Sequence, residues 1–344
     1  MAEPLLQVEN LTVSFPTDEG RVEAVRGVSF RLEQGRVLGI AGESGSGKSV
    51  TSLAILGLLP GSARVAGSVR FRGQELLGRS ERQLAGIRGS RISVIFQDPM
   101  SSLNPVYTVG WQVAEAIVEH QDVSKSEAWR RAVELLELVG IPRASERARS
   151  YPHEFSGGMQ QRVVIATAMA NDPDVIVADE ATTALDVTVQ AQVLEALKTA
   201  QEKTQAALVF ITHDLGVMAG IADEIMIMYA GKPVEFAPTD EIFYAPRMPY
   251  TVGLLGSLPR LDTDASEPLR PIPGSPPSVI DLPPGCPFAP RCPMSRDICW
   301  SEEPDLRTIR SDDHLTACHF AEELEERGED IFAPTAVDAE LLSG

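Results

Sequence analysis

The chain has 344 residues, of which 43% are hydrophobic and 23% charged, an ordinary composition for a protein with a buried core. Its formal charge of −19 argues against a surface that wraps nucleic acid or adheres to anionic lipid. No apolar run approaches the roughly 20 residues of a membrane-spanning helix, and the first residues lack the pattern of a secretory signal. We therefore expect a cytoplasmic protein without a nucleic-acid partner, which reaches a membrane only through other subunits.

The N-terminal segments alternate apolar and polar residues between glycines, which is typical of a small β-rich layer. The segment from Arg36 to Ala41 is then almost continuously apolar, which predicts a buried strand. A glycine-rich loop follows this strand, and we expect a helix from about Lys48 to Leu58 after the loop. Strand, loop and helix in this order are the setting of a phosphate-binding loop.

The loop itself matches the pattern G-x-x-x-x-G-K-[ST]. Its glycines allow successive backbone N–H groups to point at phosphate oxygens, and the helix N-terminus adds partial positive charge. In this pattern Lys48 reaches the β- and γ-phosphates, and the hydroxyl of Ser49 is a ligand of Mg²⁺. A plain Gly/Ser turn is the alternative. The residues expected to bind the nucleotide are Gly42, Glu43, Ser44, Gly45, Ser46, Gly47, Lys48, Ser49 and Thr51.

Residues from about Asp98 to Ala170 have a helical pattern, with apolar positions recurring at intervals of three and four. Two short apolar strands follow, from Val175 to Ala178 and from Ala207 to Ile211, with a helical run between them. Strand, helix and strand at this spacing predict parallel pairing. We interpret this part as an α/β core with a helical subdomain.

Asp179 and Glu180 stand at the end of the first of these strands. A carboxylate at the carboxyl end of a parallel strand faces the crevice where nucleotides bind, so Asp179 is a candidate to hold Mg²⁺. Glu180 would then polarise the attacking water. Alone, such a pair is more often a helix cap, but beside a phosphate loop the catalytic interpretation is favoured.

A Ser-Gly-Gly turn, formed by Ser156, Gly157 and Gly158, opens an apolar helix before this strand. Exposed amides at a helix start favour an anion. The phosphate loop, this turn, the strand ending in Asp-Glu and a later histidine together resemble the ATPase of ABC transporters. The resemblance implies a P-loop fold with a mixed sheet, an N-terminal antiparallel β layer and a helical subdomain. It also implies a head-to-tail dimer, in which each ATP lies between one subunit's phosphate loop and the other's Ser-Gly-Gly turn.

The resemblance implies roles for four further residues. Gln97 matches the glutamine that senses Mg²⁺ and the attacking water, and His213 matches the histidine that contacts the γ-phosphate. Asp186 matches the loop that joins the two halves of the dimer, and Phe15 is similar in position to the aromatic residue that stacks on adenine. An ordinary core phenylalanine is an equal alternative for Phe15. The expected catalytic residues are Glu180, His213 and Gln97, and the expected Mg²⁺ ligands are Ser49, Gln97 and Asp179.

The chain departs from the family pattern at two places. The signature reads FSGGM in place of LSGGQ, and Ala181 stands where the family usually has proline. The serine and both glycines are retained, so we expect phosphate binding to survive. Alanine could loosen the turn slightly, because proline restricts φ.

Within this family the chain resembles the D-type ATPase of dipeptide and oligopeptide importers. The segments that carry this resemblance are QDPMSSLNP, YPHEFSGGMQQRV, ALDVTVQAQV, PYTVGLLGSLPR and PGSPPSVIDLPPGCPFAPRC. It implies a peripheral protein on the cytoplasmic face of the membrane, with a sister ATPase, two membrane permeases and an external solute-binding protein as partners. ATP hydrolysis would energise the import of di- or oligopeptides, which this chain itself would not touch.

Proline and glycine become dense after Pro233, which predicts an appended domain with many turns. We place the ATPase domain at 1–232, with its helical subdomain at about 98–170. The C-terminal domain with its cysteine cluster then extends over 233–325, and an acidic tail over 326–344.

The four cysteines of the chain, Cys286, Cys292, Cys299 and Cys318, all fall in this C-terminal domain. Their spacing lacks the C-x2-C pairs of many structural zinc sites. Four thiolates hold either Zn²⁺ or an iron–sulfur cluster, and spacing alone leaves that choice open. Reduced thiols without metal are a further alternative. Similarity to the importer family shifts the expectation to a [4Fe–4S] cluster with a structural role, with Zn²⁺ as the alternative.

Two other classes of function are disfavoured. A soluble ABC ATPase that acts on DNA or ribosomes would carry a second cassette, a coiled coil or a basic arm, and this acidic chain has one cassette. A degenerate cassette that only senses ATP would lack the catalytic glutamate or the histidine, and both Glu180 and His213 are present.

Overall fold

The computed structural model describes residues 4–18, 20–183, 185–258, 272–309, 311–327 and 329–332. The chain folds into two compact units. Unit 1 comprises residues 1–13, 27–39 and 49–212, and unit 2 comprises residues 14–26, 40–48 and 213–344. The phosphate loop therefore belongs to the same unit as the C-terminal region, while the helix after the loop continues in unit 1.

Unit 1 contains most of the predicted α/β core and all of the helical subdomain. Its strands are parts of β1 (Leu6–Thr17), β2 (Gly20–Leu32) and β3 (Val37–Ala41), together with β4 (Arg64–Phe71), β5 (Gln74–Glu75), β6 (Ile92–Ile95), β7 (Val175–Asp179) and β8 (Ala207–Ile211). Its helices are α1 (Lys48–Ile55), α2 (Glu81–Ala85), α3 (Pro99–Ser102), α4 (Val109–His120), α5 (Lys125–Leu138), α6 (Ala144–Arg147), η1 (Pro152–Glu154), α7 (Gly157–Ala168) and α8 (Val187–Thr204).

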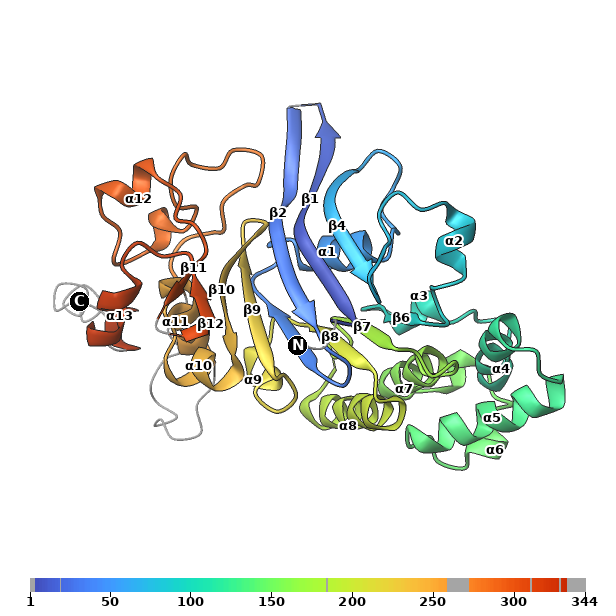
Figure 1. Cartoon of the computed structure of the whole chain (residues 1–344). Coiled ribbons are helices and arrows are strands. Elements are labelled where there is room, and N and C mark those ends of the chain that lie inside the picture. Colours follow the sequence, from blue (N-terminus) through green and yellow to red (C-terminus); the bar gives the residue numbers. More distant parts are fainter. Residues whose placement is uncertain are drawn as a thin grey trace. The chain divides into compact units, whose positions relative to one another are not determined.

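Strands β6, β7 and β8 pair in parallel, as the sequence predicts (Figure 1). In β7 and β8 every residue is buried, which is the pattern of a strand covered on both faces. The register pairs Val175 with Ala207 and Asp179 with Ile211, so Asp179 stands at the carboxyl end of the parallel strands. Strands β2, β1, β4 and β5 form a separate sheet, in that order.

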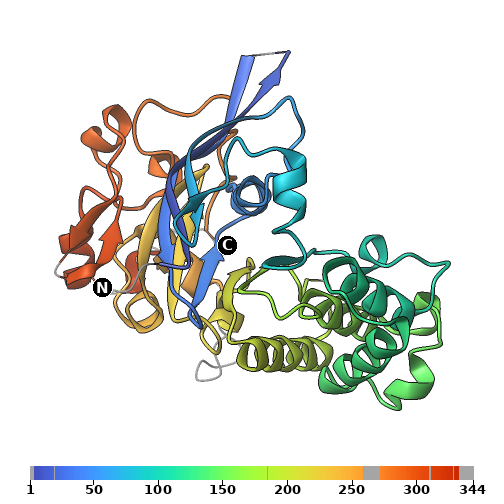
Figure 2. The same ribbon diagram turned by 45° about the vertical axis from the view of Figure 1, so that its right-hand side comes forward.

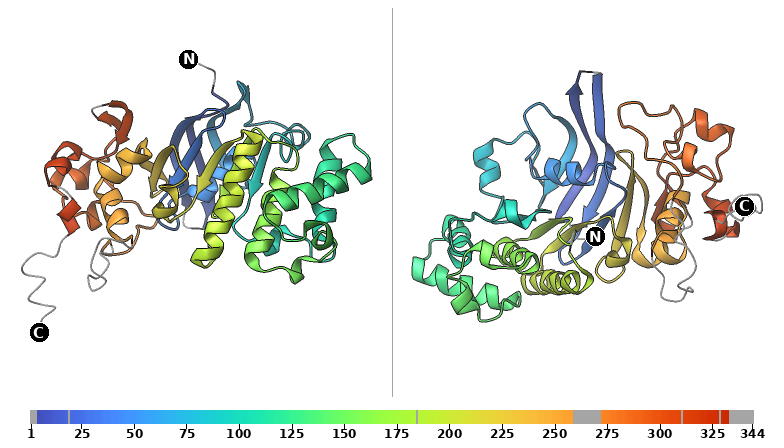
Figure 3. Two further views of the ribbon diagram at one scale, coloured as in Figure 1. Left: turned by 90° about the horizontal axis from the view of Figure 1, so that it is seen from below. Right: turned by 180° about the vertical axis from the view of Figure 1, so that it is seen from behind.

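Helices α4, α5 and α7 pack on one another and form the helical subdomain, the green helices of Figure 2. Helix α5 buries Ala128, Ala132 and Leu136, which recur every four residues and therefore lie on one face. The helix begins at the N-cap Ser124, whose hydroxyl accepts a hydrogen bond from the N–H of Glu127. The long helix α8 packs against α7 (Figure 3).

Unit 2 contains an antiparallel sheet and a turn-rich C-terminal segment. Its elements after the phosphate loop are α9 (Leu215–Met218), β9 (Glu224–Tyr229), β10 (Lys232–Pro238), α10 (Thr239–Tyr244), α11 (Pro249–Gly256), η2 (Ala289–Arg291), α12 (Asp297–Ser301), β11 (Arg307–Ile309), β12 (Ser311–Thr316), α13 (Ala321–Arg327) and η3 (Glu329–Phe332). Strand β10 pairs with β9 and β12, and β12 also pairs with β11, all antiparallel. The rings of Tyr229, Tyr250 and Phe288 pack on one another with centroids 4.5–5.3 Å apart and anchor the C-terminal segment to β9.

The predicted fold class, an α/β core with a helical subdomain and a β layer, is confirmed. Within the described residues, no helix has both the length and the apolar character needed to cross a membrane. The domain boundaries at 232 and 325 stay a prediction. The boundaries of the two compact units differ from these predicted domain boundaries, because the phosphate loop and the C-terminal segment share unit 2.

Candidate active site

The phosphate loop follows strand β3 and precedes helix α1, as predicted. Strand β3 is buried along its whole length, and the φ angles of Gly42, Gly45 and Gly47 are 149°, 79° and 99°. Lys48 is 4% exposed, and its Nζ donates hydrogen bonds to the carbonyl oxygens of Gly42 (2.8 Å) and Glu43 (3.0 Å). The loop thus has the tightly curled backbone and the inward-facing lysine that a polyphosphate requires.

Asp179, the last residue of β7, is hydrogen-bonded to two serines of helix α1. The hydroxyl of Ser49 donates to Oδ1 of Asp179 at 3.0 Å, and the hydroxyl of Ser52 donates to Oδ2 at 3.2 Å. A hydroxyl and a carboxylate in this arrangement are oxygen donors of the kind that Mg²⁺ prefers. The structure therefore brings the predicted ligands Ser49 and Asp179 together. The motif did not predict Ser52, although its place one turn after Ser49 puts it on the same helix face.

Glu180 is held by two hydrogen bonds to the same carboxylate oxygen. Oε2 accepts from Nε2 of Gln97 at 2.9 Å and from the hydroxyl of Thr183 at 3.1 Å. The backbone of Glu180 has a φ of 51°, a left-handed conformation that costs a non-glycine residue about 1–3 kcal/mol. This strain turns the chain sharply at the end of β7. Gln97 and Glu180 were both predicted, whereas Thr183 was missed because it belongs to no motif.

The Ser-Gly-Gly turn begins helix α7. Ser156 is its N-cap, and its hydroxyl accepts a hydrogen bond from the N–H of Met159 at 3.4 Å. Ser156 and Gly157 are exposed, whereas Gly158 is buried against helix α8. A Cβ atom on Gly158 would lie 2.1 Å from Cγ1 of Val189, so only glycine fits there. The exposed start of α7 leaves room for a negatively charged group.

The remaining predicted residues lie at the positions given by the structure. Asp186 is exposed and caps α8 by accepting a hydrogen bond from the N–H of Val189 at 3.0 Å. His213 is exposed at the beginning of the C-terminal part of unit 2. Phe15 is half-buried on β1, and Thr51 is fully buried on α1. Their proposed contacts with the nucleotide stay predictions.

The four cysteines of unit 2 line one cavity of about 20 Å³, together with apolar residues such as Phe288. All four are free thiols. Burial, with a smaller contribution from the nearby thiols, raises the pKa of Cys286 to about 11 and the pKa of both Cys292 and Cys318 to about 12. Nevertheless, among the described residues no group of three or more His, Cys, Asp or Glu side chains has an arrangement suited to a metal ion.

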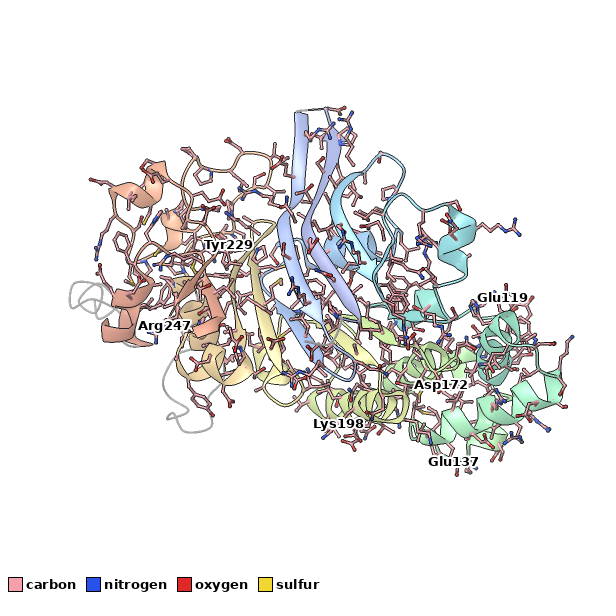
Figure 4. All side chains as sticks on the ribbon, viewed as in Figure 1. Glu119, Glu137, Asp172, Lys198, Tyr229 and Arg247 are labelled. Atoms are coloured by element: carbon pink, nitrogen blue, oxygen red, sulfur yellow. The ribbon has the colours of Figure 1, made fainter. Side chains whose placement is uncertain are left out.

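A groove of about 800 Å³ lies in unit 1, between β6, helices α3 and α4, and helix α7. Its lining includes Phe96, Tyr107 and Trp111, which are 38%, 43% and 38% exposed. The rings of Tyr107 and Trp111 stack with centroids 4.1 Å apart. Glu119, labelled on α4 in Figure 4, lies at its rim. Phe96 directly precedes Gln97, so this apolar groove adjoins the residue that holds Glu180.

Comparison with known proteins reveals two family models along the chain. Residues 25–183 match the ABC transporter model, and residues 234–299 match the model for the C-terminal region of oligopeptide/dipeptide transporters. A solved dimeric ATP-binding cassette, in a post-hydrolysis state bound to ADP and Pi, superposes with a TM-score of 0.61 at 27% sequence identity. The likeness covers 68% of this chain and 98% of that cassette.

Two curated relatives cover most of the chain. The oligopeptide transport ATP-binding protein of Mycobacterium tuberculosis is 57% identical over 316 residues, which are 92% of this chain and 52% of that relative. The chain thus spans about half the length of this relative. The dipeptide transport ATP-binding protein of Bacillus subtilis is 53% identical over 318 residues, which are 92% of this chain and 94% of that protein.

Proposed function

Because this chain belongs to the ABC transporter family, among its oligopeptide and dipeptide transport ATP-binding proteins, we propose that it binds MgATP and hydrolyses it to drive peptide import. The observation that carries the proposal is the placement of Glu180. Its carboxylate is held by Gln97 and Thr183, one residue after the Asp179 that contacts Ser49.

The phosphate loop would bind ATP through its backbone. Its N–H groups at the start of α1 and the charge of Lys48 complement the β- and γ-phosphates. In this structure Lys48 bonds the carbonyl oxygens of Gly42 and Glu43, so ATP must exchange those bonds for phosphate oxygens. The exchange replaces neutral acceptors by charged ones, which makes the new hydrogen bonds stronger.

Ser49 and Asp179 fit the magnesium site. Both offer oxygen atoms, and they lie within hydrogen-bond distance of each other at the carboxyl end of β7. When bound there, Mg²⁺ neutralises charge that develops on the phosphates. The amide nitrogen of Gln97 donates to Glu180, so its amide oxygen is the atom with which Gln97 could contact the ion.

Glu180 would orient and deprotonate the attacking water. The two donors on Oε2 set the direction of its carboxylate, because Gln97 and Thr183 reach it from different segments of unit 1. A positioned carboxylate that accepts the proton of the attacking water contributes typically 10²–10⁴-fold to the rate. The strained turn at Glu180 is the kind of backbone feature that clusters at active sites.

A second ATPase subunit would complete the site. The exposed helix start at Ser156 and Gly157 is suited to the γ-phosphate of an ATP held by a partner's phosphate loop. We propose that this partner is a sister ATPase and that Asp186 and His213 act at the shared site. We also propose that Phe15 stacks on the adenine ring and that the chain works at the cytoplasmic face of the membrane.

The apolar groove of unit 1 supports an assembly with membrane permeases. An apolar groove lined by exposed aromatic residues suits an amphipathic helix of a partner. We propose that a cytoplasmic helix of each permease occupies this groove, with an external solute-binding protein delivering the peptide. Because Phe96 of the groove adjoins Gln97, a helix seated there is coupled to the position of Glu180.

Reconstitution tests this function. The isolated chain is expected to hydrolyse ATP slowly, because half of each site comes from another subunit, and the rate should rise when the sister ATPase and permeases are added. The measurement is phosphate release per mole of chain at several protein concentrations. A fully active chain whose specific rate does not change on dilution would contradict the shared site.

The variant Trp111→Glu tests whether the permeases bind in the groove. A charge at this half-exposed position should abolish the stimulation by the permeases and leave MgATP affinity unchanged, since Trp111 lies outside the phosphate loop. Retained stimulation would place the permeases elsewhere.

We further propose that the cysteine cavity holds a [4Fe–4S] cluster, with Zn²⁺ as the alternative. The fit rests on the donor set, because four free thiols line one apolar cavity. Burial, with a smaller contribution from neighbouring thiols, raises the pKa of Cys286, Cys292 and Cys318. A bound metal favours the thiolate form, so it would lower the pKa of the cysteines that hold it. The cavity of about 20 Å³ has the size of one water-sized guest, so a cubane would require the thiols to spread.

Metal analysis of anaerobically purified protein tests this site. A cubane cluster predicts about four iron atoms and four acid-labile sulfides per chain. Replacing Cys292 by Ser should lower the metal content and the stability of unit 2. Stoichiometric zinc without sulfide would reject the cluster and keep a structural metal, whereas stable, metal-free protein would reject both.

A further inference from the structure

Arg291 links the cysteine-bearing segment to the phosphate loop within unit 2. Its Nη1 donates to Oε2 of Glu43 at 2.6 Å, and its Nη2 donates to Oε1 at 2.9 Å. This two-pronged geometry is the strongest form of arginine–carboxylate pairing. The side chain of Arg291 is 5% exposed and that of Glu43 is 26% exposed, so water weakens the pair less than it would at the surface.

The guanidinium of Arg291 is fixed on its other sides as well. Its Nε donates to the carbonyl oxygen of Pro273 at 2.9 Å, and Nη1 also donates to the hydroxyl of Tyr229 at 3.2 Å. The charge lies 5.8 Å from the ring centre of Phe288 and 5.9 Å from that of Tyr229, which Figure 4 labels in unit 2. The hydrogen bonding that Arg291 donates to Glu43 contributes most to the raised pKa of Arg291.

The backbone of Glu43 is held by Tyr250, whose ring packs on those of Tyr229 and Phe288. Its N–H donates to the hydroxyl of Tyr250 at 2.8 Å, and its carbonyl oxygen accepts from Lys48. The position of the loop lysine therefore depends on the segment that Arg291 and Tyr250 hold.

The pair also has an electrostatic consequence. Glu43 places a carboxylate inside a loop whose remaining features favour polyphosphate. Without a cation beside it, that charge would repel the phosphates. Arg291 supplies the cation from a position 248 residues further along the chain.

We propose that Arg291 is a positioning residue of the nucleotide site, which neutralises Glu43 and fixes the backbone of the phosphate loop. The inference rests on the proposed binding of MgATP. The cysteine-bearing segment reaches from Cys286 through Arg291 to Cys292. Through Arg291, this segment becomes a part of the nucleotide site, in addition to its proposed role as a metal site.

The variant Arg291→Met tests this role in the full chain. It keeps much of the side-chain volume and removes the charge, so Glu43 is left unpaired in the loop. The dissociation constant for MgATP, measured by titration, is expected to rise at least about tenfold. The matched control is Arg296→Met, because Arg296 lies between Cys292 and Cys299, near Arg291 in the sequence, but pairs with the half-exposed Glu323. It should leave the dissociation constant unchanged.

The double variant Glu43→Gln with Arg291→Met separates positioning from general damage. It leaves no unpaired carboxylate, so its dissociation constant is expected to return most of the way to that of the wild type. A double variant that binds no better than Arg291→Met would overturn the electrostatic role.

Hydrogen exchange of the nucleotide-free chain provides a readout that does not need ATP binding. The backbone amides of Glu43 to Ser46 should exchange faster in Arg291→Met than in the wild type or in the Arg296→Met control. If Arg291→Met does not fold, Glu43→Gln alone must show the same faster exchange. Unchanged exchange and unchanged affinity would overturn the proposal, whereas a wild-type chain that binds no MgATP would reject only the proposed function.

Discussion

Replacement of Glu180 by Gln is expected to lower ATP turnover by roughly 10²–10⁴-fold while MgATP still binds. The amide keeps the size of the side chain and can still accept the hydrogen bonds of Gln97 and Thr183. It cannot accept a proton from the attacking water. Single-turnover hydrolysis and equilibrium nucleotide binding, measured on the same protein in the reconstituted complex, check the two parts separately.

Glu202→Gln is the matched control for this experiment. Glu202 lies on α8 in the same unit, where its carboxylate makes a loose surface contact with Nζ of Lys198 at 4.0 Å, so loss of this charge should change neither binding nor turnover. The reaction should stall with ATP uncleaved in Glu180→Gln, which favours a persistent dimer in the presence of ATP. Equal turnover in the variant and the wild type would remove Glu180 from the catalytic role.

Replacement of Gly42 by Ala is expected to destabilise unit 2 by about 3 kcal/mol or more and to abolish MgATP binding. At φ 149° an alanine is strained, and its Cβ would lie 2.2 Å from the carbonyl oxygen of Met228. That atom belongs to the backbone of β9, so it cannot move aside without disturbing the pairing of β9 with β10. Denaturant unfolding of the full chain without nucleotide measures the loss.

Two control variants separate the loss of stability caused by backbone strain from the loss caused by the steric clash. Gly45 also has a positive φ, of 79°, but no atom of the described residues, apart from its own chain neighbours, lies within 4 Å of a Cβ placed there, so Gly45→Ala should cost only about 1 kcal/mol. Gly61 lacks a positive φ, and within the part of the chain that the structure describes a Cβ there would meet nothing beyond its chain neighbours within 4 Å, so Gly61→Ala should stay within about 0.5 kcal/mol of the wild type. If all three variants were equally stable, the close approach of the loop to β9 would be wrong.

The elements around the phosphate loop are specified by short stretches of sequence. The sequence correctly predicted strand β3 before the loop, helix α1 after it, and the parallel strands β7 and β8. These elements were predictable because apolar runs and glycine patterns act over a few neighbouring residues. The helix after the loop ends at Ile55, three residues before the predicted limit at Leu58. Helix ends are weakly specified by sequence, since capping and packing decide the last turn.

The residues that support the site were not predictable in the same way. Thr183 and Ser52 are ordinary hydroxyl residues outside any motif, and only folding brings them to Glu180 and Asp179. Arg291 belongs to a proline-rich segment and to no motif of the phosphate site. Its partner Glu43 is 248 residues away, and no pattern of local spacing connects the two.

The family and the order of the strands and helices around the phosphate loop were predictable from the sequence, which also nominates residues for contact with phosphate and magnesium. These features follow from short motifs whose chemistry needs particular residue types in succession. The folded chain adds that the phosphate loop shares a compact unit with the cysteine-bearing segment and that Arg291 forms an ion pair with Glu43 there. This ion pair joins a buried charged side chain to a second charged side chain that is far away in the sequence. Burial exists only once the chain has folded, so no local sequence pattern indicates the pair.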